Sequence, residues 1–240
     1  MKLESFSAFP KEGLRFLRSL KRNNNREWFL EHKSIYEAAV RKPMESLVER
    51  LAEDFAQFAP EMVASPKVSI YRIYRDTRFS NDKAPYKTNT AAVFPRKGLD
   101  KHEGAGFYIH LATDELLIGG GLYMSLPEDL NEVRSRIARN HAEFRQILAN
   151  PRFKKLFGGL EGIQLSRVPR GFAPDHPAAD LLRYKQYLAG RTLDPEKALQ
   201  SDFYETVKKT YQEMVPFIRF LNEPILRARR ARDRQQALLS

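Results

Sequence analysis

The fold is decided by a stretch in the middle of the chain, residues 107–124, which reads FYIHLATDELLIGGGLYM. Its first part alternates, so Tyr108 and His110 would lie on one face of a strand and large apolar side chains on the other. The polar residues at 113–115 favour a turn, and the apolar run after them predicts a second strand. We therefore expect an antiparallel β-hairpin with one face in the core.

The flanking sequence predicts further strands and two helical sections. Strands or extended segments are expected at residues 68–74, 90–94, 163–169 and 185–190. Apolar residues at helical spacing predict helices at residues 10–22, 26–42, 43–58, 127–149 and 201–222. Helices, then strands, then helices are typical of the α+β class. We expect a mostly antiparallel sheet from the middle of the chain, packed against N-terminal and C-terminal helices.

Length and composition limit the class of protein. The chain has 240 residues and no cysteine, which excludes disulfides, thiolate metal sites and a cysteine nucleophile. We expect one domain over residues 1–226 and a disordered basic tail at 227–240, where an apolar face is lacking. No apolar run reaches the ~18 residues of a membrane span, and the sequence has no secretory signal. The expected location is therefore cytoplasmic.

The net charge of +11 is concentrated in three patches. Residues 15–26 carry +5, residues 71–87 carry +3 and residues 227–234 carry +4, so the rest of the chain is nearly neutral. Clustered basic charge attracts phosphate polymers and other anionic ligands. Solvated helix faces and a loose tail are the simpler explanation of the first and third patches.

The central patch belongs to residues 71–89, which read YRIYRDTRFSNDKAPYKTN. Arginine offers a planar fork of donors to phosphate or carboxylate, and a neighbouring aspartate orients that fork. Phe79, Pro85 and Tyr86 are expected to anchor the segment. We predict an anion-binding site here; the alternative is a loop whose ion pairs tie the helices to the sheet. The candidate ligand contacts are Arg75, Arg78, Lys83, Tyr86 and Lys87.

Two other stretches contribute candidate residues. In NNNREWF at 23–29, Asn25 and Arg26 could contact a ligand or serve to cap a helix, and both alternatives stay open. Residues 170–187 place His176 in a short rigid loop. Histidine suits proton transfer near neutral pH, although a lone loop histidine is more often a structural hydrogen-bonding group. Two basic candidates follow it, Arg183 and Lys185.

The triple glycine at 119–121 lies inside a predicted strand. It lacks the spacing of known phosphate loops, so it indicates a bulge or a close approach by a ligand or another backbone. His110, a further ligand candidate, could face that opening; tight packing against a helix explains the glycines equally well. No recognised catalytic motif occurs. The five scattered histidines could ligate a metal together with acidic residues, but no spacing predicts such a site, and the cofactor stays unknown.

Several stretches together resemble a known family. They are FLRSLKRNNNREWFLEHKSIYE, RIYRDTRFSNDKAPYKTN, GAGFYIHL, GGGLY and PRGFAPDHPAADLLRYK. They resemble a bacterial and fungal family catalogued as domain of unknown function 2461, over about residues 6–222. The most specific part is RDxRFSxDKxPYK, which residues 75–87 match throughout. The basic tail lies outside the resemblance, which implies a single-domain cytoplasmic protein and adds no mechanism.

Three functions stay open. The first is a binding module for an anionic small molecule or nucleic acid, contacted by residues 72–87. The second is an enzyme on a phosphorylated or nucleic-acid substrate, which requires acid–base residues to meet in one cleft. The acid–base candidates are Asp76, Asp82 and His176. The third is an interaction protein whose charged loop is structural.

Overall fold

The predicted hairpin is present in the computed structural model, which describes residues 6–238. Its strands are β2 (Gly106–Leu111) and β3 (Leu116–Leu122). The turn closes with a hydrogen bond from the Ala112 amide to the Glu115 carbonyl oxygen at 2.8 Å. The three apolar side chains of β2 are at most 1% exposed, so they enter the core as the alternation predicts.

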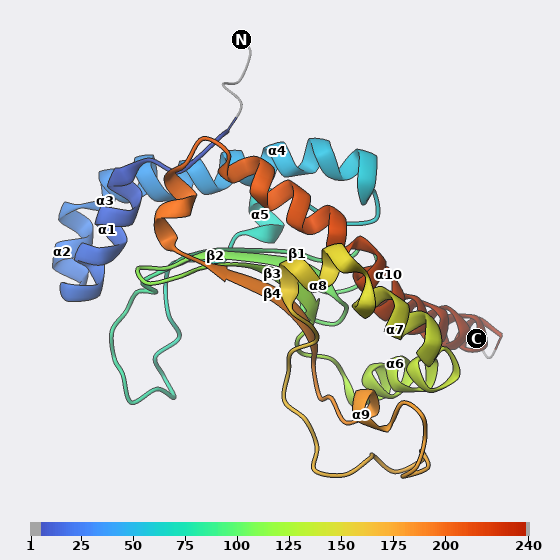
Figure 1. Cartoon of the computed structure of the whole chain (residues 1–240). Coiled ribbons are helices and arrows are strands. Elements are labelled where there is room, and N and C mark those ends of the chain that lie inside the picture. The colour runs from blue at the N-terminus through green and yellow to red at the C-terminus, as the bar shows by residue number, and fades with distance from the viewer. Residues whose placement is uncertain (1–5, 239–240) are drawn as a thin grey trace. The chain divides into compact units, whose positions relative to one another are not determined.

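Two further strands extend the hairpin to a four-stranded antiparallel sheet with the order β1–β2–β3–β4 (Figure 1). β1 (Thr90–Phe94) coincides with the strand predicted at 90–94. β4 (Tyr187–Leu193) forms where the sequence predicts a strand or an extended segment. Along the chain, helices precede β1, separate β3 from β4 and follow β4, and the α+β class is confirmed.

The chain divides into two compact units. Of the described residues, the first unit contains residues 6–94, 108–118 and 192–210. The second unit contains residues 95–107, 119–191 and 211–238. The division passes through β2, β3 and β4. The expectation of one domain stays a prediction.

The N-terminal helices belong to the first unit. They are α1 (Lys11–Arg22), α2 (Arg26–Glu31), α3 (Lys33–Tyr36), α4 (Lys42–Phe58) and α5 (Pro66–Ser69). The single helix predicted at 26–42 is therefore wrong, because the chain breaks at His32 and forms a π-helical turn over Glu37–Arg41. That wider turn lies just before Pro43, whose ring would clash with an ordinary α-helical turn.

The strand predicted at 68–74 is also wrong. Its first residues belong to α5, where Pro66 occupies the first helical position. The residues after α5 are extended and make only isolated antiparallel bridges, from Ile70 to Ala92 and from Tyr74 to Tyr86. Valine, isoleucine and tyrosine favour strands, but the helical turn set by the proline outweighs that preference here.

The helices of the second unit follow the hairpin. They are α6 (Pro127–Arg139), α7 (His141–Ala149), α8 (Pro151–Phe157) and the short α9 (Ala179–Leu182). The helix predicted at 127–149 is thus divided at Asn140. The core of this unit is aromatic: Phe144 stacks on Phe220 with ring centroids 4.7 Å apart.

The last helix, α10 (Phe203–Ala237), follows a short 3-10 helix at Pro195–Leu199 and is longer than predicted. A disordered tail was expected at residues 227–240, but α10 continues to Ala237; residues 239–240 lie outside the described part of the chain. Arg229 donates to Asp129 at 2.7 Å and to Glu103 at 2.6 Å, and the Asp129 side chain is fully buried. Ion pairs therefore replace the missing apolar face. None of the helices within residues 6–238 has the length and apolar character to cross a membrane.

The triple glycine of β3 marks a close approach between backbones. A Cβ at Gly121 (φ 131°) would collide with the Tyr187 carbonyl oxygen of β4. A Cβ at Gly120 would meet the Met214 sulfur of α10. The predictions of a backbone approach and of packing against a helix are both confirmed. That His110 faces this opening stays a prediction, because His110 and the glycines belong to different units.

Candidate functional site

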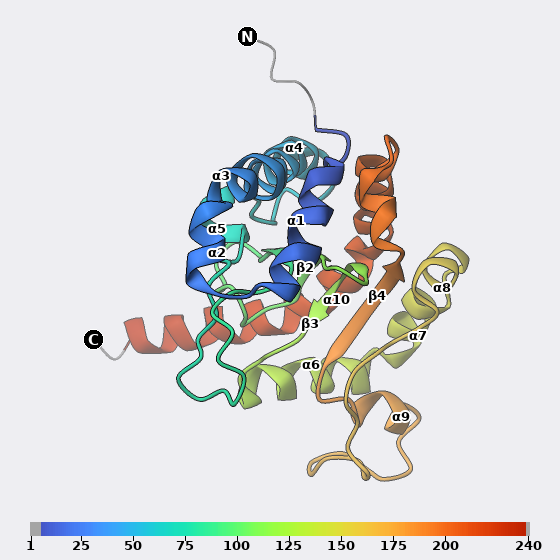
Figure 2. The same cartoon turned by 90° about the vertical axis from the view of Figure 1, so that its left-hand side faces the viewer.

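The charged segment forms a long loop that closes on itself. Residues 70–75 run antiparallel to residues 85–92, with hydrogen bonds from the Tyr71 amide to the Ala91 carbonyl (3.0 Å) and from the Lys87 amide to the Ile73 carbonyl (2.8 Å). The intervening loop, residues 76–84, extends away from α4 (Figure 2). Arg72 and Lys87 therefore lie in the two antiparallel segments that form the base of the loop.

Two arginines of the loop are neutralised by aspartates of the same loop. Arg78 donates from Nε and Nη2 to the two oxygens of Asp76, at 3.0 and 2.7 Å. Arg75 donates from Nη1 to Asp82 at 2.5 Å and to the Ala84 carbonyl at 3.1 Å. These four side chains are therefore engaged in holding the loop.

The same contacts change the proton affinity of the two aspartates. The Arg78 side chain, and then its amide, lower the pKa of Asp76. The Ala84 amide, and then Arg75, lower the pKa of Asp82. Carboxylates with lowered pKa values are poor proton acceptors, so this arrangement does not favour the acid–base role proposed for Asp76 and Asp82.

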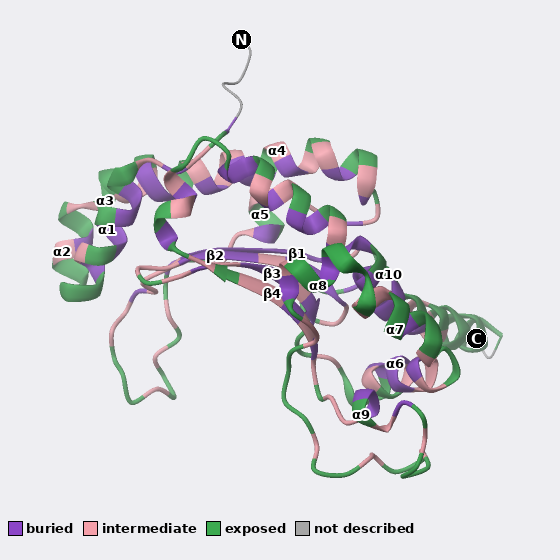
Figure 3. Ribbon diagram, viewed as in Figure 1, coloured by how far each residue is buried: buried purple, intermediate pink, exposed green. Residues whose placement is uncertain are grey.

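The apolar residues of the segment divide between core and solvent (Figure 3). Tyr86 is 4% exposed and stacks on Phe29 with ring centroids 4.1 Å apart, so it anchors the loop as predicted. The prediction that Phe79 is an anchor is wrong, because its side chain is 93% exposed. Lys83 donates to the Thr77 carbonyl at 3.1 Å and thus also contributes to the loop.

The asparagine-rich turn before α2 braces this loop. Asn24 donates to the Tyr86 carbonyl at 2.9 Å and accepts from the Tyr86 amide at 3.1 Å. Asn25 accepts from the Trp28 amide at 3.0 Å and is therefore the cap of α2. Arg26 is exposed, and its charge acts on the Tyr86 hydroxyl, opposing the burial that raises the pKa of Tyr86.

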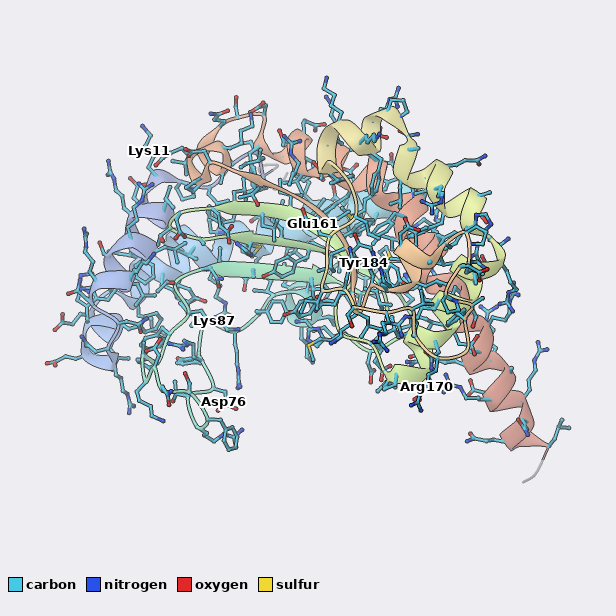
Figure 4. All side chains as sticks on the ribbon, turned by 60° about the horizontal axis from the view of Figure 1, so that its bottom comes forward. Lys11, Asp76, Lys87, Glu161, Arg170 and Tyr184 are labelled. Carbon is cyan, nitrogen blue, oxygen red and sulfur yellow. The ribbon has the colours of Figure 1, made fainter. Side chains whose placement is uncertain are left out.

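The base of the loop holds two cations, of which Lys87 lies over an aromatic ring. The Lys87 ammonium lies 5.1 Å from the centroid of the Tyr71 ring, and Lys87 is half-buried. Figure 4 shows it where the loop returns to the sheet, with Asp76 farther out along the loop. Burial, and then the positive charge of Arg72, lower the pKa of Lys87. Within residues 6–238, neither Lys87 nor Arg72 forms an ion pair with a carboxylate.

A row of polar side chains begins beside Tyr71 on the β2–β3 hairpin. The rings of Tyr71 and Tyr108 lie 6.4 Å apart. His110 approaches the Tyr108 hydroxyl through Nδ1 at 3.2 Å and Glu115 through Nε2 at 2.9 Å. We call Tyr71, Lys87, Tyr108, His110 and Glu115 the His110 cluster. All five belong to the first unit.

The remaining candidates lie in the second unit. His176 accepts at Nδ1 from the Ala178 amide at 3.0 Å, a hydrogen bond that shapes its own turn. The Arg183 carbonyl accepts from the Leu165 amide, and the Lys185 amide donates to Ile163. Asp82 and His176 thus belong to different units, so their convergence in one cleft stays a prediction.

A comparison with protein families matches residues 12–220 to the conserved hypothetical protein family DUF2461. The chain belongs to this family. The match includes the loop and the whole His110 cluster, while the basic end of α10 lies beyond it. A search of curated proteins gives no match.

The sequence did not single out Tyr71, Tyr108 or Glu115 as candidate site residues, and Arg72 was included only as part of the segment 72–87. The period-two pattern placed Tyr108 and His110 on one face, so their proximity was available from the sequence. The proximity of Glu115 to His110 was not, because Glu115 is the last residue of the predicted turn and its contact with His110 depends on where the hairpin closes.

Proposed function

We propose that this protein binds an anionic ligand, bearing phosphate or carboxylate, at Arg72 and Lys87. The observation that carries the proposal is the pair of cations at the base of the loop. Lys87 is half-buried, and within residues 6–238 neither Lys87 nor Arg72 forms an ion pair with a carboxylate, although the Arg72 charge also acts on Asp76. Two nearby positive charges repel each other, and a bound anion would relieve that repulsion. Oxygens of a phosphate or carboxylate are the complementary acceptors.

This proposal narrows the broader prediction for residues 72–87. Arg75 and Arg78 are already neutralised by Asp82 and Asp76, so their part is to hold the loop. The ring of Tyr86 is enclosed, which removes it from the proposed contacts. A compact pair of cations suits a small ligand better than the extended basic track that nucleic acid requires.

A second candidate function is an interaction surface at the tip of the loop. Phe79 is 93% exposed on a loop whose ion pairs fix its shape, and the Arg78 guanidinium lies 5.7 Å from its ring. An exposed aromatic beside an arginine is the composition found at the centre of protein interfaces. In this version the charged residues of the loop are structural.

A thermal-shift screen tests the binding proposal. We would test nucleotides, sugar phosphates, inorganic pyrophosphate, dicarboxylates, polyphosphate, short DNA and short RNA. A ligand at 100 times its Kd adds about 2.7 kcal/mol, which raises the Tm by about 2–4 °C for each kcal/mol at this chain length. Arg72→Gln and Lys87→Met should abolish the shift.

The matched control is Lys67→Met, which removes an exposed lysine from α5. It should leave the shift intact. A stabilising anion whose effect survives both Arg72→Gln and Lys87→Met would contradict the proposal. A response confined to DNA, RNA or polyphosphate that falls steeply with salt would instead support nucleic acid or another polyanion as the ligand.

A further inference from the structure

Three side chains of the β2–β3 hairpin are hydrogen-bonded in a row. Tyr108 and His110 are two residues apart on β2 and therefore share a face, while Glu115 lies immediately before β3. The Tyr108 hydroxyl lies 3.2 Å from His110 Nδ1, and His110 Nε2 lies 2.9 Å from Glu115 Oε1. A hydroxyl, an imidazole and a carboxylate thus follow one another in hydrogen-bond contact.

The carboxylate determines which imidazole nitrogen carries the proton. An ionised Glu115 can only accept, so Nε2 of a neutral His110 carries the hydrogen and donates it to Oε1. Nδ1 then has a lone pair that can accept a hydrogen bond from the Tyr108 hydroxyl. This arrangement places a hydroxyl against a base that a third group orients, which is the general pattern of an activated nucleophile.

His110 and Tyr108 differ in exposure, as a buried base and an accessible nucleophile would. His110 is 9% exposed, so its orientation is fixed by its surroundings. Tyr108 is half-buried, which leaves part of the ring accessible. Its ring adjoins Tyr71, which in turn carries the Lys87 ammonium over its face. The three hydrogen-bonded side chains and the proposed anion site therefore lie next to each other within the first unit.

We infer that Tyr108 is a nucleophile toward the phosphorus of a phosphoester, with His110 as its base and Glu115 as the positioning residue. This inference rests on the proposed function, in which Arg72 and Lys87 hold the phosphate oxygens. The Tyr108 proton passes to His110 Nδ1 as the phenolic oxygen bonds to phosphorus. The phosphorus–oxygen bond to the leaving alcohol breaks, and the departing oxygen takes that proton.

Water completes the cycle. It attacks the phosphotyrosyl phosphorus and gives a proton to Nδ1, and the bond from phosphorus to the Tyr108 oxygen breaks. Tyr108 then recovers its proton from His110. The sum is hydrolysis of the ester to an alcohol and a phosphate, with no oxidant or metal required in the balance.

Covalent labelling tests the inference directly on the full-length protein. An aryl sulfonyl fluoride reacts with an activated phenol to form a sulfonate ester with loss of fluoride, and peptide mass spectrometry locates it. Tyr108 should react at least about 10-fold faster than the exposed Tyr74 and Tyr123, since a positioned base contributes 10²-fold or more. His110→Asn should remove this advantage, and Glu115→Gln should reduce it.

The controls separate chemistry from folding. Tyr74 and Tyr123 act as internal references in every variant, and Glu132→Gln is the matched carboxylate control on α6. Tyr108 reacting no faster than the two references would overturn the inference. So would an unchanged Tyr108 rate in a folded His110→Asn or Glu115→Gln variant, because the row would then only brace the hairpin.

Two results distinguish this inference from the proposed function. If Tyr108 is reactive but no anion stabilises the protein through Arg72 and Lys87, the binding proposal fails and the nucleophile stands without its substrate class. If anions stabilise the protein through Arg72 and Lys87 but Tyr108 does not react with the sulfonyl fluoride, the inference about Tyr108 fails and the binding proposal stands. Slower Tyr108 labelling in the presence of pyrophosphate would support both.

Discussion

Lys87 carries a charge that its surroundings oppose. Burial, and then the charge of Arg72, lower the pKa of Lys87 below its value in an unfolded chain, about 10.4. The folded state therefore holds the Lys87 proton less tightly than the unfolded state does. Stability attributable to this group is lowest below the folded pKa and rises as the pH approaches the unfolded value.

Lys87→Met should accordingly stabilise the ligand-free protein at pH 7, by up to about 1 kcal/mol, because methionine keeps the apolar stem without the charge. The gain should shrink when unfolding is repeated near pH 10, where wild-type Lys87 loses its charge. Thermal unfolding of the two proteins at both pH values measures this. A variant that is less stable at pH 7 would show that the Lys87 charge is already compensated.

Asp54 gives the opposite case, a charge that its neighbours favour. It accepts from the Tyr204 hydroxyl at 2.6 Å and from the Lys208 ammonium at 2.8 Å, with a side chain 15% exposed. Burial alone would raise the pKa of Asp54, but the two hydrogen bonds outweigh it and the pKa is lowered. This stabilisation is present above about pH 4 and is lost as the pH falls through the folded value.

Asp54→Asn should cost about 1–3 kcal/mol at pH 7, because it leaves Lys208 without its partner. The difference from wild type should narrow at pH 3. Urea unfolding at the two pH values gives both numbers, and Asp175→Asn, at an exposed loop position, is the control. An equal loss of unfolding free energy in Asp54→Asn at pH 3 and at pH 7 would mean that Asp54 acts through packing and not through its charge.

At the scale of elements, the loop and the helices it touches differ in what they contribute to stability. Phe29 of α2 is 2% exposed against Tyr86, whereas Phe79 at the loop tip is 93% exposed. Phe29→Ala should cost about 3–5 kcal/mol, and Phe79→Ala less than about 0.5 kcal/mol. Chemical denaturation compares them. A large loss for Phe79→Ala would mean that the tip is covered in the folded protein.

The end of α10 depends on charge in place of apolar packing. The fully buried Asp129 carboxylate accepts from Arg229 at 2.7 Å and from Arg232 at 3.2 Å. Arg229→Ala should cost about 2–4 kcal/mol, since it leaves a buried carboxylate with one partner. Arg230→Ala, at an exposed neighbour, should cost almost nothing. Indistinguishable variants in urea unfolding would favour a loose tail.

These elements show how far the sequence could predict the fold. The alternation around Tyr108 and the helical stripes are local patterns, so the hairpin, β1, α1 and the buried face of α4 could be predicted. The end of α10 could not, because its partner Asp129 lies about a hundred residues away. The strand prediction at 68–74 was wrong for a different reason, because the helical turn that begins at Pro66 outweighed the strand propensity of the residues after it.

For the molecule as a whole, the location of the candidate site could be predicted from the sequence, but the cations that are left for a ligand could not. The charge density of residues 71–87 and the family match both direct attention to the loop. Neither tells which cations the aspartates neutralise. That distinction depends on side-chain geometry: Arg75 and Arg78 are paired within the loop, whereas Arg72 and Lys87 remain at its base with the His110 cluster.

Anion binding by Lys87 and Arg72 can be measured by isothermal titration with inorganic pyrophosphate. We would titrate the full-length wild type, Lys87→Met and the control Lys67→Met at constant ionic strength. We expect saturable heat for wild type and Lys67→Met, and at least about a 10-fold loss of affinity in Lys87→Met, because one charge-assisted contact worth about 1.5–3 kcal/mol is removed. Equal binding by all three proteins, or none by wild type, would contradict the binding proposal.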